Sequence, residues 1–191
     1  MEKICLDGTW RMVGNGYDCT GNIPGSVYSF LLGNKLKDDP YYRENEWDYL
    51  ELMNHDYAFS RKFDFEKQSD DRKILLHCEG LDTLSEISLN GNFVAATKNM
   101  HRTYEFDVSE YLNDGENEIK ITFRSPNKYI AERYADEELF GAGDALKGFM
   151  HLRKAHCMFG WDWGARLPDA GIWREISLIR ENSARLKDVR I

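Results

Sequence analysis

Hydrophobic and polar residues alternate through much of the middle of the chain, which is the pattern of a β-strand with one buried face. The clearest segments are 57–65, 87–89, 104–108 and 119–123. Asn90-Gly91 follows the second of them, and both residue types accept the positive φ that a tight hairpin turn requires. The apolar run 74–76 is typical of a strand buried on both faces, and we expect a further strand over residues 173–179.

Two short helices are expected to interrupt this pattern. Ser26 can cap a helix over residues 27–31, because its hydroxyl accepts a hydrogen bond from the first turn. Residues 127–140 carry Ile130 and Tyr134 at helical spacing among strong helix formers. No other helix is expected. Many short strands without the crossover helices of a parallel sheet predict an all-β fold, an antiparallel β-sandwich with short helical insertions.

The second helix belongs to a long insertion between strands that continues through Gly141, Gly143 and Gly148. Excursions of this length from a sandwich are usually functional or disordered. The glycine spacing superficially resembles a phosphate-binding loop. The segment follows a helix rather than a strand, however, and lacks the Gly-Lys-Ser/Thr ending, so we do not expect nucleotide binding.

Composition narrows the class of protein. The 191 residues are 42% hydrophobic and 30% charged, as in an ordinary globular protein, and they carry a net charge of −8. Because there is no basic run and no stretch of membrane-spanning length, neither nucleic acid nor a membrane is an expected partner. The amino terminus lacks the apolar run of a secretory signal, so we expect the four cysteines to be free thiols in the cytoplasm.

Catalytic and metal-binding motifs are incomplete. His151, His156 and Cys157 lie close together but form no paired ligand motif, so neither a metal nor another cofactor is expected. Paired carboxylates could serve glycoside hydrolysis. The available pairs are Glu137-Glu138, Asp70-Asp71 and Glu44 with Glu46. Each lies in a polar stretch without the apolar surroundings that raise an acid's pKa, so the chain shows no complete catalytic apparatus.

The densest candidate for binding chemistry is Trp161-Asp162-Trp163, which glycines bracket on both sides. Indole faces stack on the apolar faces of pyranose rings, and a carboxylate between them can accept hydrogen bonds from sugar hydroxyls. This chemistry indicates carbohydrate. The alternative is an aromatic core cluster in which Asp162 caps a turn.

Two further groups of residues accompany this segment. Arg153 and Lys154 precede it and could hold Asp162 ionised by ion pairing, although simple surface solvation is the other interpretation. The second group is the aromatic stretch 39–47, whose side chains could line a groove or pin a loop to the sandwich; we favour the structural role.

Several motifs occur in an order that resembles the amino-terminal domain of β-mannosidases, in family two of the glycoside hydrolases. They are Leu6-x-Gly8-x-Trp10, Ile23-Pro24-Gly25-x-Val27, Asp39-Pro40-Tyr41-Tyr42-Arg43-x-Asn45, Gly80-Leu81-Asp82-Thr83, Leu89-Asn90-Gly91, Leu152-Arg153-Lys154, Phe159-Gly160-Trp161-Asp162-Trp163-Gly164 and Gly171-Ile172-Trp173-Arg174. The Trp-Asp-Trp-Gly loop separates this pattern from β-galactosidase and β-glucuronidase relatives. Ala165 stands where the family usually has proline, a departure that concerns the rigidity of the loop.

The resemblance implies a jelly-roll β-sandwich of the galactose-binding-domain-like kind. In such enzymes this domain precedes immunoglobulin-like domains and a (β/α)₈ barrel that carries both catalytic glutamates. The resemblance further implies that Asp162 binds hydroxyls of the terminal mannose, that Trp161 and Trp163 shape the pocket, and that Arg153 and Lys154 support the loop.

Three hypotheses follow. The first is the amino-terminal domain of a cytoplasmic, retaining β-mannosidase-like exo-glycosidase that cannot catalyse alone; the others are a stand-alone carbohydrate-binding module and a purely structural domain. We assign residues 1–180 to the sandwich and 181–191 to the start of a linker or strand that leads to a following domain, because residues 184–191 read as the beginning of a new strand.

Overall fold

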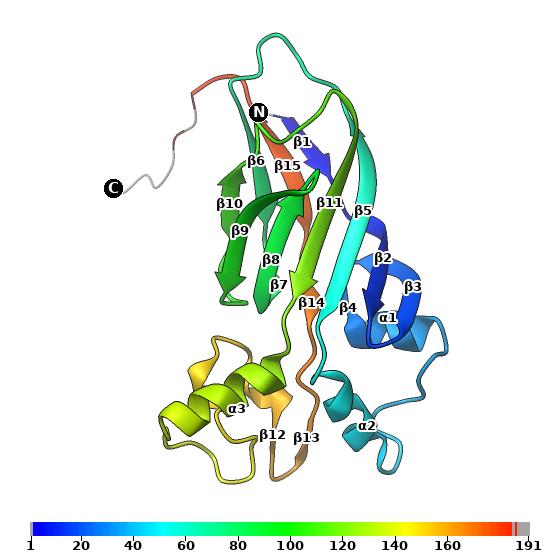
Figure 1. Cartoon of the computed structure of the whole chain (residues 1–191), viewed down its shortest axis with the longest axis vertical. Coiled ribbons are helices and arrows are strands. Elements are labelled where there is room, and N and C mark those ends of the chain that lie inside the picture. Colours follow the sequence, from blue (N-terminus) through cyan, green and yellow to red (C-terminus); the bar gives the residue numbers. More distant parts are fainter. Residues whose placement is uncertain (1, 185, 187–191) are drawn as a thin grey trace.

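The computed structural model describes residues 2–184 and 186, and its two largest sheets are antiparallel, with helices gathered at one end (Figure 1). The larger sheet has the order β3-β2-β5-β11-β8-β9. Its strands are β2 (Gly8–Gly14), β3 (Tyr17–Ile23), β5 (Tyr57–Phe65), β8 (Leu84–Leu89), β9 (Asn92–Lys98) and β11 (Gly115–Phe123). The smaller sheet has the order β1-β15-β6-β10. Its strands are β1 (Glu2–Cys5), β6 (Lys73–Cys78), β10 (Tyr104–Asp107) and β15 (Ile176–Glu181).

The core lies between these two sheets and follows the alternation expected from the sequence. In β11, Ile119, Ile121 and Phe123 are buried and alternate with more exposed residues. They belong to the same hydrophobic cluster as Leu76 and Leu178 of the smaller sheet. Burial of one face of each sheet is the main stabilising contribution to such a fold. The predicted all-β, galactose-binding-domain-like sandwich is confirmed.

Local expectations hold in part. Leu89 pairs with Asn92 across the Asn90-Gly91 turn, and both turn residues have positive φ, 52° and 80°, as predicted. The strand expected over residues 173–179 begins later, at Ile176. The cause is a change of sheet: β14 (Gly171–Ile172) pairs with β4 (Gly25–Ser26) and β7 (Leu81–Asp82) in a separate small sheet before the chain enters β15.

Two of the three helices are the expected ones. Helix α1 (Val27–Gly33) is capped by Ser26, which exchanges hydrogen bonds with Ser29 in a capping box. Helix α3 (Pro126–Asp136) has Ser125 as its cap and ends four residues earlier than predicted. It ends because the backbone of Glu137 turns extended and its carbonyl accepts a hydrogen bond from His151.

Helix α2 (Asn45–Leu52) was not predicted, and the expectation that this region is a loop is wrong. Only Tyr49 and Leu52 of this helix are buried, so no apolar periodicity marks it. Contacts distant in sequence hold it in place: the Tyr49 hydroxyl donates to the Asp38 carbonyl, and the Tyr28 hydroxyl donates to the Tyr49 carbonyl. Tertiary packing therefore determines this helix.

The remaining elements lie in the insertion between β11 and β14. They are the 3₁₀ turns Phe149–His151 and His156–Met158 and the strands β12 (Phe159–Trp161) and β13 (Gly164–Arg166). A second, smaller hydrophobic cluster of Ile130, Leu152 and Phe159 supports this region, which is therefore packed. All but two of residues 184–191, where a new strand was expected, lie outside the described part of the chain.

Three findings concern disulfides, membrane spans and metal sites. The four cysteines are free thiols. In the described part of the chain, the helices are too short or too polar to cross a bilayer. The same residues contain no cluster of three or more His, Cys, Asp or Glu side chains arranged to hold a metal ion.

Candidate functional site

The tryptophan segment forms a β-hairpin, residues 159–166, which we call the tryptophan hairpin. Strand β12 pairs with β13, and Asp162 and Trp163 occupy the turn. The hairpin projects from the helical end of the sandwich, between α2 and α3 (Figure 1). Trp161 is 52% exposed and Trp163 is 84% exposed, and Asp162 is exposed as well. The alternative of a buried aromatic cluster therefore does not describe these side chains.

The Asp162 carboxylate points to no cation. Within residues 2–184 and 186 it has no hydrogen-bond or ion-pair partner. Arg153 is exposed, and its backbone pairs with residues 99 and 100, which directly follow β9. Lys154 is only 2% exposed and forms an ion pair with Asp82. The structure thus separates the two cations from Asp162, whose acceptor capacity is free for a ligand.

The base of the tryptophan hairpin is fixed to the rest of the domain. Phe159 is fully buried, and its carbonyl accepts a hydrogen bond of 3.0 Å from the Leu146 amide. Gly160 has a φ of +104°, and a Cβ added there would lie 2.7 Å from Cγ of Arg166. Glycine is therefore required at this position for both its conformation and its lack of a side chain. A buried base and an exposed turn are the arrangement expected of a recognition loop.

Arg166 connects the hairpin to helix α2. Its backbone N–H donates to Oε1 of Glu46 at 2.9 Å, and its guanidinium lies 3.6 Å from the same carboxylate oxygen. The guanidinium also lies over the Trp47 ring, 5.8 Å from the ring centre, and donates to the Asp144 carbonyl at 2.8 Å. Three segments distant in sequence therefore meet at one side chain.

Trp47 is a further candidate residue, which was not among those expected to bind the substrate. It is 57% exposed and lines a groove of about 470 Å³ between α2 and α3, beside the tryptophan hairpin. Its neighbours in the groove include Leu50, Asn54, Asn127, Ile130, Leu146 and Lys147. In the sequence, Trp47 belongs to the aromatic stretch 39–47. A structural role was preferred for that stretch over a role in lining a groove. The structure shows both roles, because Trp47 also lies under Arg166.

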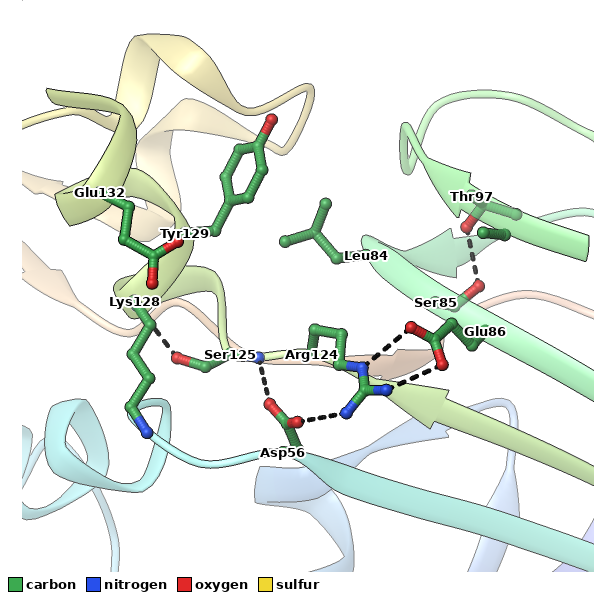
Figure 2. A pocket seen from close by; sticks show the side chains of 11 residues that line it. Asp56, Leu84, Ser85, Glu86, Thr97, Arg124, Ser125, Lys128, Tyr129 and Glu132 are labelled. Carbon is green, nitrogen blue, oxygen red and sulfur yellow. Dashed lines mark hydrogen bonds and ion pairs between the residues drawn. The ribbon is translucent and has the colours of Figure 1, made fainter. Parts of the chain in front are cut away.

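A second hollow, of about 370 Å³, lies between α3 and the β8–β9 hairpin. Figure 2 shows Arg124 extended between Glu86 and Asp56, to which it donates three hydrogen bonds of 2.7 to 3.1 Å. Asp56 also accepts from the Ser125 amide at the start of α3. Since these polar groups are bonded to one another, they join α3 to the larger sheet and offer little capacity to a ligand.

None of the acidic pairs noted in the sequence forms a hydrolytic pair. Asp71 binds Arg180 with hydrogen bonds of 2.7 and 2.8 Å, Glu46 binds Arg166, and Glu138 accepts from the Tyr134 hydroxyl. Burial raises the pKa of Asp169 to about 6, but this carboxylate accepts hydrogen bonds from two backbone amides inside the fold. These carboxylates therefore take part in contacts within the domain.

Comparisons with known proteins agree with this geometry. Beta-mannosidase of Mus musculus is 34% identical over 193 residues, which cover 95% of this chain and 22% of the mouse protein. A probable beta-mannosidase of Caenorhabditis elegans is 33% identical, over 92% of this chain and 21% of the nematode protein. The crystal structure of beta-D-mannosidase from Dictyoglomus thermophilum matches with a TM-score of 0.91 and 37% identity, over 98% of this chain and 24% of that protein.

The chain spans about a fifth of the length of these curated relatives and matches their amino-terminal portion. A family model described as "glycosyl hydrolase 2 galactose-binding domain-like" matches residues 10–174, which include nearly all of the larger sheet and the whole tryptophan hairpin. On this basis the chain belongs to the galactose-binding-like domain family of the family two glycoside hydrolases.

Proposed function

We propose that this chain serves as the amino-terminal domain of an exo-acting β-mannosidase and that its tryptophan hairpin binds the terminal mannosyl residue of the substrate. The observation that carries the proposal is the hairpin itself: Asp162, a carboxylate without a partner among the described residues, stands between two exposed indoles on a buried base. The similarity to β-mannosidases over nearly the whole chain supports the choice of sugar.

The chemistry assigned to the hairpin is recognition. Trp161 and Trp163 offer apolar ring faces for the C–H face of a pyranose, and Asp162 accepts hydrogen bonds from its hydroxyls. A site that binds a hydroxyl in this way discriminates between epimers, because the wrong epimer leaves the carboxylate without a partner in a desolvated pocket. The two carboxylates of a retaining hydrolysis belong, in this proposal, to a barrel domain that follows in the same protein.

The other expected residues take supporting roles in this proposal. Arg153 remains a candidate for contact with the substrate or with the neighbouring domain, since its side chain is exposed. Lys154 is buried and supports the loop through its ion pair with Asp82. We further propose that residues 1–180 belong to the domain and that 181–191 lead to a following one, although Glu181 is still the last residue of β15. We also propose a cytoplasmic location, which the four free thiols support.

The decisive experiment replaces Asp162 with alanine in the full-length enzyme and measures hydrolysis of a β-mannoside. Loss of hydrogen bonds to a charged acceptor is worth roughly 1.5–3 kcal/mol, so kcat/KM should fall on the order of 10- to 100-fold without unfolding the protein. The exposed Asp64 in β5 lies away from the hairpin, and Asp64→Ala is the matched control. Unchanged kinetics of Asp162→Ala would remove the hairpin from the substrate site.

A stand-alone carbohydrate-binding module is the second candidate, and the exposed Trp47 groove beside the tryptophan hairpin favours it. Calorimetric titration of the 191-residue chain with mannose and β-manno-oligosaccharides separates the two. Measurable affinity supports a module that acts alone, whereas no heat of binding supports a half-site that needs its partner domain. A purely structural domain predicts that mutations in the hairpin change stability and leave substrate preference unaltered.

A further inference from the structure

The side chain of Lys154 is completely buried, although lysine is among the residues least often found inside a protein. Its Nζ forms an ion pair with Asp82, which is 5% exposed at its side chain, and donates a hydrogen bond of 2.6 Å to the carbonyl oxygen of Asp169. Asp82 accepts a further hydrogen bond from the Thr83 hydroxyl. We call the contacts among Lys154, Asp82 and Asp169 the Lys154 bridge.

The Lys154 bridge joins the two ends of the loop that carries the tryptophan hairpin. Lys154 directly precedes residues 155–168, and Asp169 directly follows them. Asp82 belongs to β7, where it pairs with Gly171 of β14. One side-chain nitrogen therefore closes the base of this loop and attaches it to the small sheet β4-β14-β7 at the end of the sandwich.

The far end of the loop is held by helix α1 as well. Oδ1 of Asp169 accepts hydrogen bonds from the amides of Tyr28 and Ala170, at 3.2 and 2.7 Å. The Val27 amide donates to the Ala170 carbonyl at 2.8 Å, and the Tyr28 hydroxyl donates to the Pro168 carbonyl at 3.3 Å. The Asp169 carbonyl thus accepts a hydrogen bond from the Lys154 ammonium, and its carboxylate accepts one from the first turn of α1.

A buried ion pair is a poor means of stabilising a core, because apolar residues of similar volume often stabilise it as well or better. The pair instead constrains geometry. Nζ of Lys154 must lie within hydrogen-bonding distance of both the Asp82 carboxylate and the Asp169 carbonyl oxygen, and this fixes the separation of the two loop ends. We propose that Lys154, Asp82 and Asp169 are positioning residues that hold Trp161, Asp162 and Trp163 in the orientation that binds the sugar. The link to sugar rests on the function proposed above; the closure of the loop does not.

Hydrogen exchange of the 191-residue chain tests the closure directly. Lys154→Met keeps an unbranched side chain one heavy atom shorter and removes its donors. Amides of residues 155–168 should then exchange at least tenfold faster, while amides of β5 and β11 keep their wild-type rates. The matched control is Lys62→Met, which removes an exposed ion pair between Lys62 of β5 and Glu116 of β11 and should leave the exchange of residues 155–168 unchanged. Wild-type exchange in residues 155–168, or a uniform increase across the domain, would overturn the proposal.

Asp82→Asn is the second variant, and it decides the matter if Lys154→Met does not fold. Asparagine keeps an acceptor for Lys154 and removes the charge, so the same local increase in exchange is expected with a smaller amplitude. If Asp82→Asn folds and Lys154→Met does not, wild-type exchange of residues 155–168 in Asp82→Asn would overturn the proposal.

Kinetics of the full-length enzyme separate positioning from general stability. At a temperature where both variants are folded, loss of orientation should raise KM for a β-mannoside at least tenfold, and wild-type KM would contradict the positioning role. The exchange result is independent of the sugar. If Asp162→Ala leaves the kinetics unchanged but Lys154→Met still loosens residues 155–168, the proposed function fails and the closure stands.

Discussion

The guanidinium of Arg166 and the indole of Trp47 lie in contact, 5.8 Å from cation to ring centre, although 119 positions separate them in the chain. Glu46, the neighbour of Trp47, binds both the backbone and the side chain of Arg166. Helix α2 and the tryptophan hairpin are therefore connected, and the hairpin is attached through this helix to the sandwich core, to which α2 contributes Tyr49 and Leu52.

The first prediction concerns Glu46. Glu46→Ala removes the acceptor of the Arg166 amide and the ion pair together, so unfolding in urea should show a loss of about 1–2 kcal/mol. Glu46→Gln keeps an acceptor for the amide and should cost less than half as much. Equal losses for the two variants would show that the charge, and not the hydrogen bond to the backbone, matters at this position.

The second prediction concerns Gly160, whose φ of +104° and close approach to Arg166 exclude a side chain. Gly160→Ala should destabilise the domain by about 1–3 kcal/mol, because alanine is strained at this φ and its Cβ would overlap the Arg166 side chain. Gly143→Ala is the control, since nothing lies within 4 Å of a Cβ at that position. Thermal denaturation of both variants measures the difference, and similar melting temperatures would contradict the argument.

The third prediction is a pH dependence. Burial raises the pKa of Asp169 from its ordinary value of 3.8 to about 6, so the folded chain binds this proton more tightly than the unfolded chain does. The associated stability is present below about pH 4 and is lost as the pH rises to about 6, with an amplitude of up to about 3 kcal/mol.

Asp169→Asn isolates this effect, because asparagine keeps the acceptor for the Tyr28 and Ala170 amides and does not titrate. Urea unfolding at pH 4, 5, 6 and 7 should show the wild-type chain losing stability relative to the variant across that range. Parallel curves for the two proteins would mean that Asp169 does not titrate in this range.

The sandwich could be predicted from the sequence because each of its long strands buries one face, which leaves a period of two in the residue pattern. The strand of residues 57–65 and the Asn90-Gly91 turn are local features of this kind. The tryptophan hairpin could be identified as a candidate site because two Trp residues next to a carboxylate and bracketed by glycines are an unusual local composition.

Other features depend on contacts that no local pattern records. Helix α2 buries two side chains only, and the contact of Trp47 with Arg166 joins residues far apart in the sequence. The partner of Lys154 is 72 positions away, so its nearness to Asp162 in the chain suggested the wrong ion pair. The change of sheet after Ile172 follows from the pairing of β14 with β4 and β7, which is also long-range.

The last prediction separates recognition from packing at the tryptophans. Trp163 is 84% exposed, so Trp163→Ala should change the free energy of unfolding by less than about 0.5 kcal/mol, as surface substitutions do. Trp10 is 1% exposed and donates from its indole to the Leu6 carbonyl, so Trp10→Ala should cost about 3–5 kcal/mol. In the full-length enzyme, Trp163→Ala should nevertheless lower kcat/KM for a β-mannoside at least tenfold. A large loss of stability in Trp163→Ala with unaltered kinetics would show that this indole supports the fold and that the sugar is bound elsewhere.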